Sequence, residues 1–291
     1  AAAQYVTSAK LGTYKTKDEG GNDVDTAVTS KTKLADLGFD TSGSSAIEIK
    51  SGDKKINLYV DQDTTVADFV QKLKDAGLNA SFDEKQSRFF ISAKDSGADS
   101  KFTISHTVLS ADQTAAKDAL LQTMDYSTLS SSDQGTVKQV LSDLQNAQTT
   151  EAKTAAYKSL QDIADAAAKT KVTDYYTKQL TEKYTNEYIT TETVTDDEGN
   201  ETTVEKLTDA GRQALKDANL DNDIYVDDDR LAVVKHKLIA QNVKKDLATD
   251  GYKKSIEDAV TYGSVDAGVA EKATRDADII VAVDNYADQI S

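Results

Sequence analysis

Hydrophobic and polar residues alternate on both sides of Gly52-Asp53, and this pattern predicts a β-hairpin. A period of two gives each strand one buried face and one solvent face. Glycine supplies the positive φ of a two-residue turn at little cost. The same alternation predicts a second hairpin, with strands over 79–82 and 88–92, and a further short strand near Phe102. The apolar positions of the first hairpin are Ile47, Ile49, Ile56, Leu58 and Val60.

Between the two hairpins the period changes from two to that of an α-helix. Thr65 precedes the first apolar residue and Asp68 follows three positions later, which is a capping-box pattern. Gly77 is suited to end the helix in the left-handed conformation. The apolar stripe consists of Val66, Phe69, Val70 and Leu73, spaced i, i+3, i+4 and i+7.

The first 45 residues are rich in Thr, Lys and Asp, and their apolar positions are scattered. Residues 17–23 contain two glycines and several acidic residues, which predict a hairpin loop between short strands. Residues 32–39 predict a short helical turn that ends at Gly38.

Helical spacing begins after Ile104. Ser110 is suited to cap one helix, Ser131 or Ser132 the next, and a long third helix is expected from Thr150. The third helix carries a stripe that includes three tyrosines. Such a stripe is more typical of a bundle core with solvated hydroxyl groups than of a ligand site. Its members are Ala156, Leu160, Ile163, Val172, Tyr176, Leu180, Tyr184 and Tyr188.

The helical pattern is interrupted once. Residues 189–206 read as an exposed β-hairpin around the polar sequence 196–200. Helices are then expected over 207–218, 231–247 and 252–262, and a final segment begins at Asp266. Within that segment the period of 277–284 permits either a strand or a helix.

These elements predict an α+β fold with small antiparallel sheets, one capped helix and a large, mainly helical inserted domain. With 291 residues, the chain is long for one domain. We expect a domain over 1–106, to which 275–291 can return, and an insertion over 107–274 with its hairpin near 188–206.

Composition narrows the classes of partner. A net charge of −16 argues against nucleic acid and anionic membranes, which require clustered Lys and Arg. The chain contains no cysteine, so neither disulfides nor cysteine metal sites form. It also contains no proline, which fits either compositional drift toward helix or a need to refold rapidly after export. No apolar run is long enough to span a membrane, and no signal-peptide pattern opens the chain, which starts like an interior piece of a longer protein.

Candidate chemistry is sparse, and we expect no catalytic residues and no cofactor. The two histidines, His106 and His236, have no nucleophile or carboxylate motif beside them, and we expect both to be solvated. Dense acidic clusters at 221–223 and 227–229 suggest a calcium site only weakly, because the glycine and glutamate of an EF-hand are missing. Aspartates that cap the next helix explain them more simply. The weak metal candidates are Asp221, Asp223, Asp227 and Asp229.

Residues 34–97 resemble the flagellar filament cap family, hook-associated protein 2, and the flagellin hook IN motif found in cap proteins and some flagellins. The likeness covers about 100 residues well and the last 15 weakly, and 107–274 carry no family signature. Residues 4–11 are similar to the exit from the stalk domain of clostridial cap proteins. The matching segments are Leu34–Gly38, the strand with Ile47 and Ile49, Thr64–Phe69, Ala76–Phe82 and Arg88–Ser92.

The resemblance implies a structural role. Cap proteins leave the cell through the flagellar channel, without a cleaved signal peptide, and form a ring at the filament tip where flagellin folds and inserts. The resemblance therefore implies that the full-length protein is extracellular and homo-oligomeric and has flagellin as a partner. It also implies that this chain is a head fragment that lacks the coiled-coil arms. Some members contact host mucins, for which the loops 195–201 and 219–229 are candidate surfaces. Two alternatives remain: an exposed variable region of a flagellin or hook–filament junction protein, and an acidic calcium-dependent surface adhesin.

Overall fold

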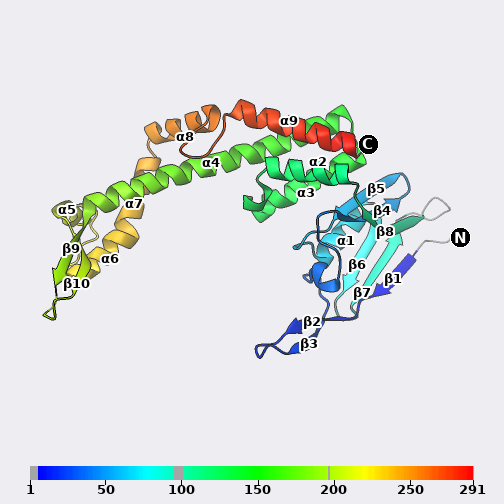
Figure 1. The fold of residues 1–291 in the computed structure, drawn as a ribbon, viewed down its shortest axis with the longest axis horizontal. Helices are drawn as coiled ribbons and strands as arrows, with labels where there is room; N and C mark the ends of the chain where they lie inside the picture. The colour runs from blue at the N-terminus through cyan, green and yellow to red at the C-terminus, as the bar shows by residue number, and fades with distance from the viewer. Residues whose placement is uncertain (1–5, 95–100, 196, 291) are drawn as a thin grey trace. The chain divides into compact units, whose positions relative to one another are not determined.

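The computed structural model describes residues 6–94, 101–195 and 197–290 and has an α+β fold (Figure 1). Helix accounts for 53% and strand for 22%, and the strands form several small antiparallel sheets. The chain divides into two compact units. Unit 1 contains 1–161 and 277–291, and unit 2 contains 162–276. Unit 2 is thus an insertion in the sequence of unit 1.

One sheet of unit 1 has the strand order β5-β4-β8. It consists of β4 (Ser45–Ser51), β5 (Lys54–Tyr59) and β8 (Phe102–Val108). Ser51 pairs with Lys54, so Gly52 and Asp53 form the predicted two-residue turn, and Gly52 has a φ of 58°. The hairpin and the additional strand are confirmed.

A second sheet of unit 1 has the order β1-β7-β6. It consists of β1 (Val6–Lys10), β6 (Leu78–Asp83) and β7 (Arg88–Ala93), so the second predicted hairpin is also confirmed. The two hairpins belong to different sheets. Of the segment compared with a stalk exit, residues 4 and 5 lie outside the described residues.

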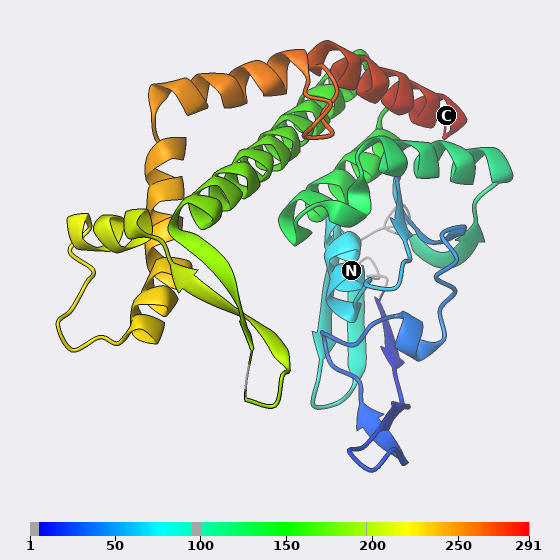
Figure 2. The ribbon, with the colours of Figure 1, turned by 60° about the vertical axis from the view of Figure 1, so that its left-hand side comes forward.

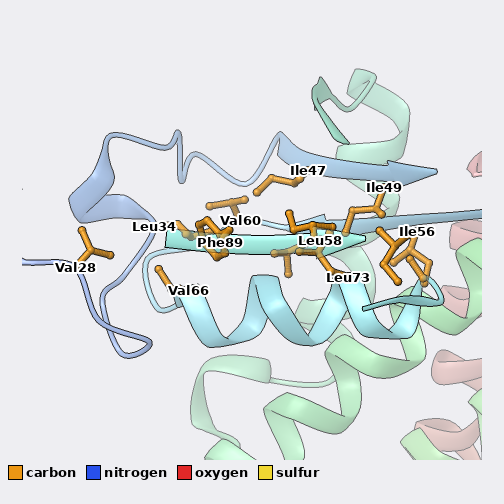
Figure 3. Packing of buried hydrophobic residues seen from close by; sticks show 13 residues of the cluster. Val28, Leu34, Ile47, Ile49, Ile56, Leu58, Val60, Val66, Leu73 and Phe89 are labelled. Carbon is orange, nitrogen blue, oxygen red and sulfur yellow. The ribbon is translucent and has the colours of Figure 1, made fainter. Parts of the chain in front are cut away.

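Helix α1 (Val66–Asp75) has the predicted capping box. The Thr65 side chain accepts from the Asp68 amide, and the Asp68 carboxylate accepts from the Thr65 amide at 2.8 Å. Gly77 has a φ of 85°, as expected after a helix end. Figure 3 shows the apolar side chains of α1 and the strands meeting in one core. Its buried members include Leu34, Ile47, Ile49, Leu58, Val66, Leu73, Phe89 and Ile91.

Two small elements precede this core, and both were predicted. Strands β2 (Thr13–Lys17) and β3 (Asp23–Ala27) form a hairpin. The short 3-10 helix η1 (Ala35–Leu37) ends at Gly38, which has a φ of 87°.

The remaining elements of unit 1 are helical. They are α2 (Ala111–Thr123), the 3-10 helix η3 (Tyr126–Thr128), α3 (Ser131–Asn146), the first part of α4 (Thr150–Tyr188) and the returning part of α9 (Lys272–Gln289).

The structure differs from the sequence expectations at one helix cap and at the boundary between the units, and it decides the conformation of one ambiguous segment. The cap of α3 is Ser130, one residue before the two serines proposed, because its hydroxyl accepts from the Asp133 amide. Residues 277–284 are helical, which decides between the two periods that the sequence permitted. The compact units divide at 161–162 and not at the expected 106–107, because α3 covers the free edge of β5: the Asn57 amide donates to the Gln145 side chain at 3.0 Å.

Unit 2 contains the rest of α4 and a two-stranded hairpin of β9 (Ile189–Thr195) and β10 (Glu201–Leu207), both visible in Figure 2. Residue 196, in the predicted turn of this hairpin, lies outside the described residues. Helix α5 (Asp209–Asp217) follows. The long helix expected over 231–247 is built from α6 (Asp227–Val233), a π-helical segment η4 (Val234–Leu238) and α7 (Ile239–Leu247), and α8 (Asp250–Tyr262) comes next.

Two apolar clusters hold unit 2 together. One connects the end of α4 with the hairpin, α5 and α7, and the other connects the middle of α4 with α8. The first contains Leu180, Tyr188, Ile189, Leu207, Leu215, Val234, Leu238, Ile239 and Val243, and the second contains Ala168, Val172, Ile256 and Val269.

Candidate functional site

The acidic clusters that the sequence singles out lie in the loop between α5 and α6 and at the start of α6. Arginines bind two of the four candidate carboxylates. Arg230 donates from Nε to Asp221 at 2.7 Å, and Arg212 forms two parallel hydrogen bonds with Asp227, at 2.9 and 3.1 Å. These hydrogen bonds lower the pKa of both Asp221 and Asp227. Planar guanidinium groups suit such pairs because both N–H directions match a carboxylate.

The other two candidates are used differently. The Asp229 carboxylate, in the first turn of α6, accepts from the Val226 amide at 3.1 Å and so caps the start of this helix. Asp223 is exposed. Among residues 6–94, 101–195 and 197–290, no group of three or more His, Cys, Asp or Glu side chains is arranged to hold a metal ion. The structure therefore explains this acidic sequence by arginine pairing and helix capping.

A cleft of about 250 Å³ adjoins this cluster, between β10 and the helices α5 and α6. Apolar and charged side chains both line it, so it combines two kinds of contact surface. The apolar lining residues are Val204, Leu207 and Leu231, and the charged ones are Glu205, Lys206, Arg212, Asp227 and Asp228.

In unit 1 the structure reveals a polar cluster that the sequence did not indicate. His106 lies inside β8 and not after the last strand, and its Nε2 is 2.8 Å from the Ser45 hydroxyl. Ser45 also donates to Asp40 at 3.2 Å. His106 is exposed to solvent, as expected from the sequence, and it also hydrogen-bonds Ser45. The contact results from strand register: His106 is opposite Ile47 on β4, which makes Ser45 its diagonal neighbour.

The order of groups in this cluster does not match a nucleophilic triad. In a triad the carboxylate orients the imidazole, which in turn activates the hydroxyl. Here the carboxylate and the imidazole both contact the same hydroxyl, and Ser45 is only 2% exposed. Asp40 also accepts from the Ser42 amide and hydroxyl, which together lower its pKa. The cluster ties the loop before β4 to the β4-β8 strand pair.

His236, the second histidine, lies on the π-helical segment η4 and is exposed. Two lysines, Lys235 and Lys237, flank it in the sequence. Lys235 donates to Glu205 of β10 at 2.6 Å. This pair joins the helix to the hairpin, and the described residues give His236 no nucleophile to activate.

A buried polar cluster connects the helices of unit 1 to β5. The hydroxyl groups of Tyr59 and Tyr286 are in hydrogen-bond contact, and Gln145 donates to both. Burial raises the pKa of each tyrosine, most strongly for Tyr286. Lys117 lies 5.1 Å above the Tyr59 ring and donates to the Gly43 carbonyl, and burial lowers its pKa. These polar groups bind to one another or to the backbone. Such contacts offset the cost of removing polar atoms from water.

The tyrosine stripe of α4 is part of the cores, as its spacing predicted. Tyr184 and Tyr188 belong to the first apolar cluster of unit 2 and Tyr176 to the second. Tyr184 donates to Asp246 at 2.6 Å, and Asn242 donates to Tyr188 at 3.0 Å. The tyrosines thus pack with their rings and bind neighbouring helices with their hydroxyls.

Comparisons with known proteins do not assign this chain to a family: no family model, no curated protein and no solved structure matches it. Within the described part of the chain, every helix is too short or too polar to cross a membrane.

Proposed function

We propose that this chain is the head region of a bacterial flagellar filament cap, a structural and assembly protein. The full-length protein would form a homo-oligomeric ring at the filament tip and support the folding and insertion of flagellin there. In this proposal the protein is extracellular, and its work is steric. Contact with mucin or surface glycans would be an additional property of its exposed loops.

The observation that carries the proposal is that the segments with the family resemblance all contribute buried residues to one apolar core of unit 1. Leu34 is buried where 34–38 meets α1, and its amide donates to the Thr64 carbonyl at 2.8 Å. Phe89 stacks edge-on against Phe69, with ring centroids 5.3 Å apart. The similar residues are therefore coupled to one another in space. Chance similarity of surface residues would not require this coupling.

The division into units also supports the proposal. Unit 2 is inserted between residues 161 and 277 of unit 1 and has its own apolar clusters. A protein that acts through its surface gains exposed area from an additional compact unit while its framework is retained. The exposed residues of the β9-β10 hairpin and the loop before α6 extend that surface.

Localisation of the full-length protein on intact filaments tests the proposal. An epitope tag replacing Gly199, at the tip of the β9-β10 hairpin, would be expressed in a strain that lacks the chromosomal copy. Immunogold electron microscopy is expected to label filament tips only and the strain to regain filaments, whereas the untagged protein should give no label. Label along the filament body would instead support the flagellin or junction alternative, and label on the cell surface the adhesin.

A further inference from the structure

Two aliphatic side chains project into solvent from the loop between α5 and α6, which we call the 219–226 loop. Ile224 is 82% exposed and Val226 is 62% exposed. Single exposed apolar residues are common on protein surfaces, but two in one short loop form a small apolar patch. The residues around them indicate whether this patch is suited to bind a partner.

The loop is held in one conformation by its own polar groups. The Asn222 side chain accepts from the Ile224 amide at 3.2 Å, and the Tyr225 amide donates to the Asn222 carbonyl at 2.9 Å. Arg230 binds both Asp221 and, at 3.3 Å, the Asn222 carbonyl. The segment that carries Ile224 is therefore braced from two directions.

Both ends of the loop are anchored as well. At its start, the Leu220 amide donates to the Leu215 carbonyl at 3.0 Å, and Leu220 packs on the apolar cluster of unit 2. At its end, Val226 donates to Asp229, and Asp227 is bound by Arg212. Because the loop is already ordered, a partner that covers the two apolar side chains would lose little additional conformational entropy.

The surroundings of the patch are acidic. Between residues 212 and 230 there are six aspartates and three cations, Arg212, Lys216 and Arg230. Asp223 and Asp228 are exposed and have no ion pair within the described part of the chain. Asp228 also lines the adjoining cleft, together with Val204 and Leu231. The surface thus combines two exposed apolar side chains, a cleft lined by both apolar and charged residues, and unpaired negative charge.

We propose that the 219–226 loop and this cleft form a docking surface for a partner protein that presents aliphatic or aromatic side chains flanked by Lys or Arg. Charge complementarity favours this partner, because basic groups would meet Asp223 and Asp228 while apolar groups cover Ile224 and Val226. A second copy of this acidic chain fits less well, since its net charge of −16 repels the same surface. An anionic membrane is disfavoured for the same reason. The inference does not depend on the proposed function.

Peptide display tests the predicted chemistry directly, because a random library covers every class of side chain. Random peptides would be selected on the whole chain, and selected peptides would be synthesised and their affinities measured. We expect a consensus of apolar residues flanked by Lys or Arg. The double substitution Ile224→Ser with Val226→Ser should weaken binding about tenfold or more, the size expected for loss of a hot spot.

Matched variants separate the contribution of the apolar side chains to binding from that of the negative charges. Val265→Ser removes an aliphatic side chain that is 97% exposed in another loop of unit 2 and should leave binding unchanged. Asp223→Asn with Asp228→Asn should weaken binding several-fold and reduce its salt dependence. The pair Asp174→Asn with Asp278→Asn, at exposed positions elsewhere, changes the net charge equally and should have little effect.

Three results would overturn the proposal. One is that the selected peptides bind the Ile224→Ser, Val226→Ser variant as tightly as the wild type, or that no peptide is selected. Another is a consensus without basic residues. The third is sedimentation showing that the wild-type chain self-associates and that the Ile224→Ser, Val226→Ser variant does not, which would make a second copy the occupant. Unchanged circular dichroism of each variant confirms that the fold is retained.

Discussion

The hydroxyl groups of Tyr59 and Tyr286 meet although 227 positions separate them in the sequence. Tyr59 ends β5, and Tyr286 lies on α9, the helix with which the chain returns to unit 1. Gln145 of α3 donates to the Tyr286 hydroxyl at 2.9 Å and also binds Tyr59. One polar cluster therefore joins a strand to two helices from distant parts of the chain.

Tyr286→Phe should destabilise unit 1 by about 1–3 kcal/mol, because Tyr59 and Gln145 each lose one hydrogen bond inside the protein. Urea unfolding monitored by circular dichroism measures this difference in the free energy of unfolding. Tyr262→Phe is the control, since Tyr262 is 72% exposed, and it should change stability little. Equal effects of the two substitutions would mean that the buried contact contributes nothing.

Gly211→Ala should destabilise unit 2. Gly211 lies in the first turn of α5, where a methyl group would be 2.4 Å from the carbonyl oxygen of Tyr188, far inside van der Waals contact. Backbone atoms cannot shift freely, so a loss of roughly 1–3 kcal/mol is expected. Hydrogen exchange of the α5 and α7 amides localises the effect.

Gly135→Ala provides the opposite case. Gly135 lies inside α3, and a methyl group there would contact nothing within 4 Å. Alanine has the higher helix propensity, so this variant should be more stable by about 0.5–1 kcal/mol. A stabilising Gly211→Ala or a destabilising Gly135→Ala would contradict the packing described for these helices.

Stability should fall at alkaline pH partly through Tyr157. Burial, with the hydrogen bond to Asp284 at 2.6 Å, raises the pKa of Tyr157 from 10.0 to about 12. The folded state therefore retains a proton that the unfolded chain loses. Its stabilising contribution is complete below pH 10 and disappears as the pH rises through about 12.

Tyr157→Phe should reduce the loss of stability between pH 10 and 12 by at most about 1.4 kcal/mol per pH unit, the value for one proton. Urea unfolding over this pH range, together with tyrosinate absorbance, measures both quantities. Tyr262→Phe again serves as the control. An unchanged slope for Tyr157→Phe would show that this hydroxyl titrates normally in the folded protein.

Calcium should not raise the melting temperature of the chain. Asp221 and Asp227 are already bound by Arg230 and Arg212, so a cation would have to displace these arginines. Calorimetric titration and thermal unfolding with and without calcium measure the effect. Stoichiometric heat of binding together with a higher melting temperature would support the alternative function, a calcium-dependent adhesin.

Local patterns accounted for most individual elements. The Thr65–Asp68 capping box, the Gly52-Asp53 turn and the tyrosine stripe of α4 each depend on residues within a few positions or a few helical turns of one another. The cap of α3 was misplaced by one residue because several consecutive serines offer equivalent hydroxyl groups, and backbone geometry alone selects Ser130. The segment 277–284 fits either period because its apolar residues run without interruption from 279 to 283, and the helix that forms leaves Ile280 and Val281 exposed.

The sequence by itself determined where most strands, helices and turns form, since these depend on φ preferences, capping side chains and hydrophobic period. Only the tertiary structure decided which elements meet. It put the two hairpins in separate sheets, brought Ser45 to His106 through the register of β4 and β8, and bound Asp221 to Arg230. It also divided the units within α4 and α9. Such pairings are selected by the burial of whole apolar faces and by the pairing of the polar groups buried with them. Both the burial and the polar pairing depend on many residues that are distant in the sequence, so a local sequence pattern does not predict them.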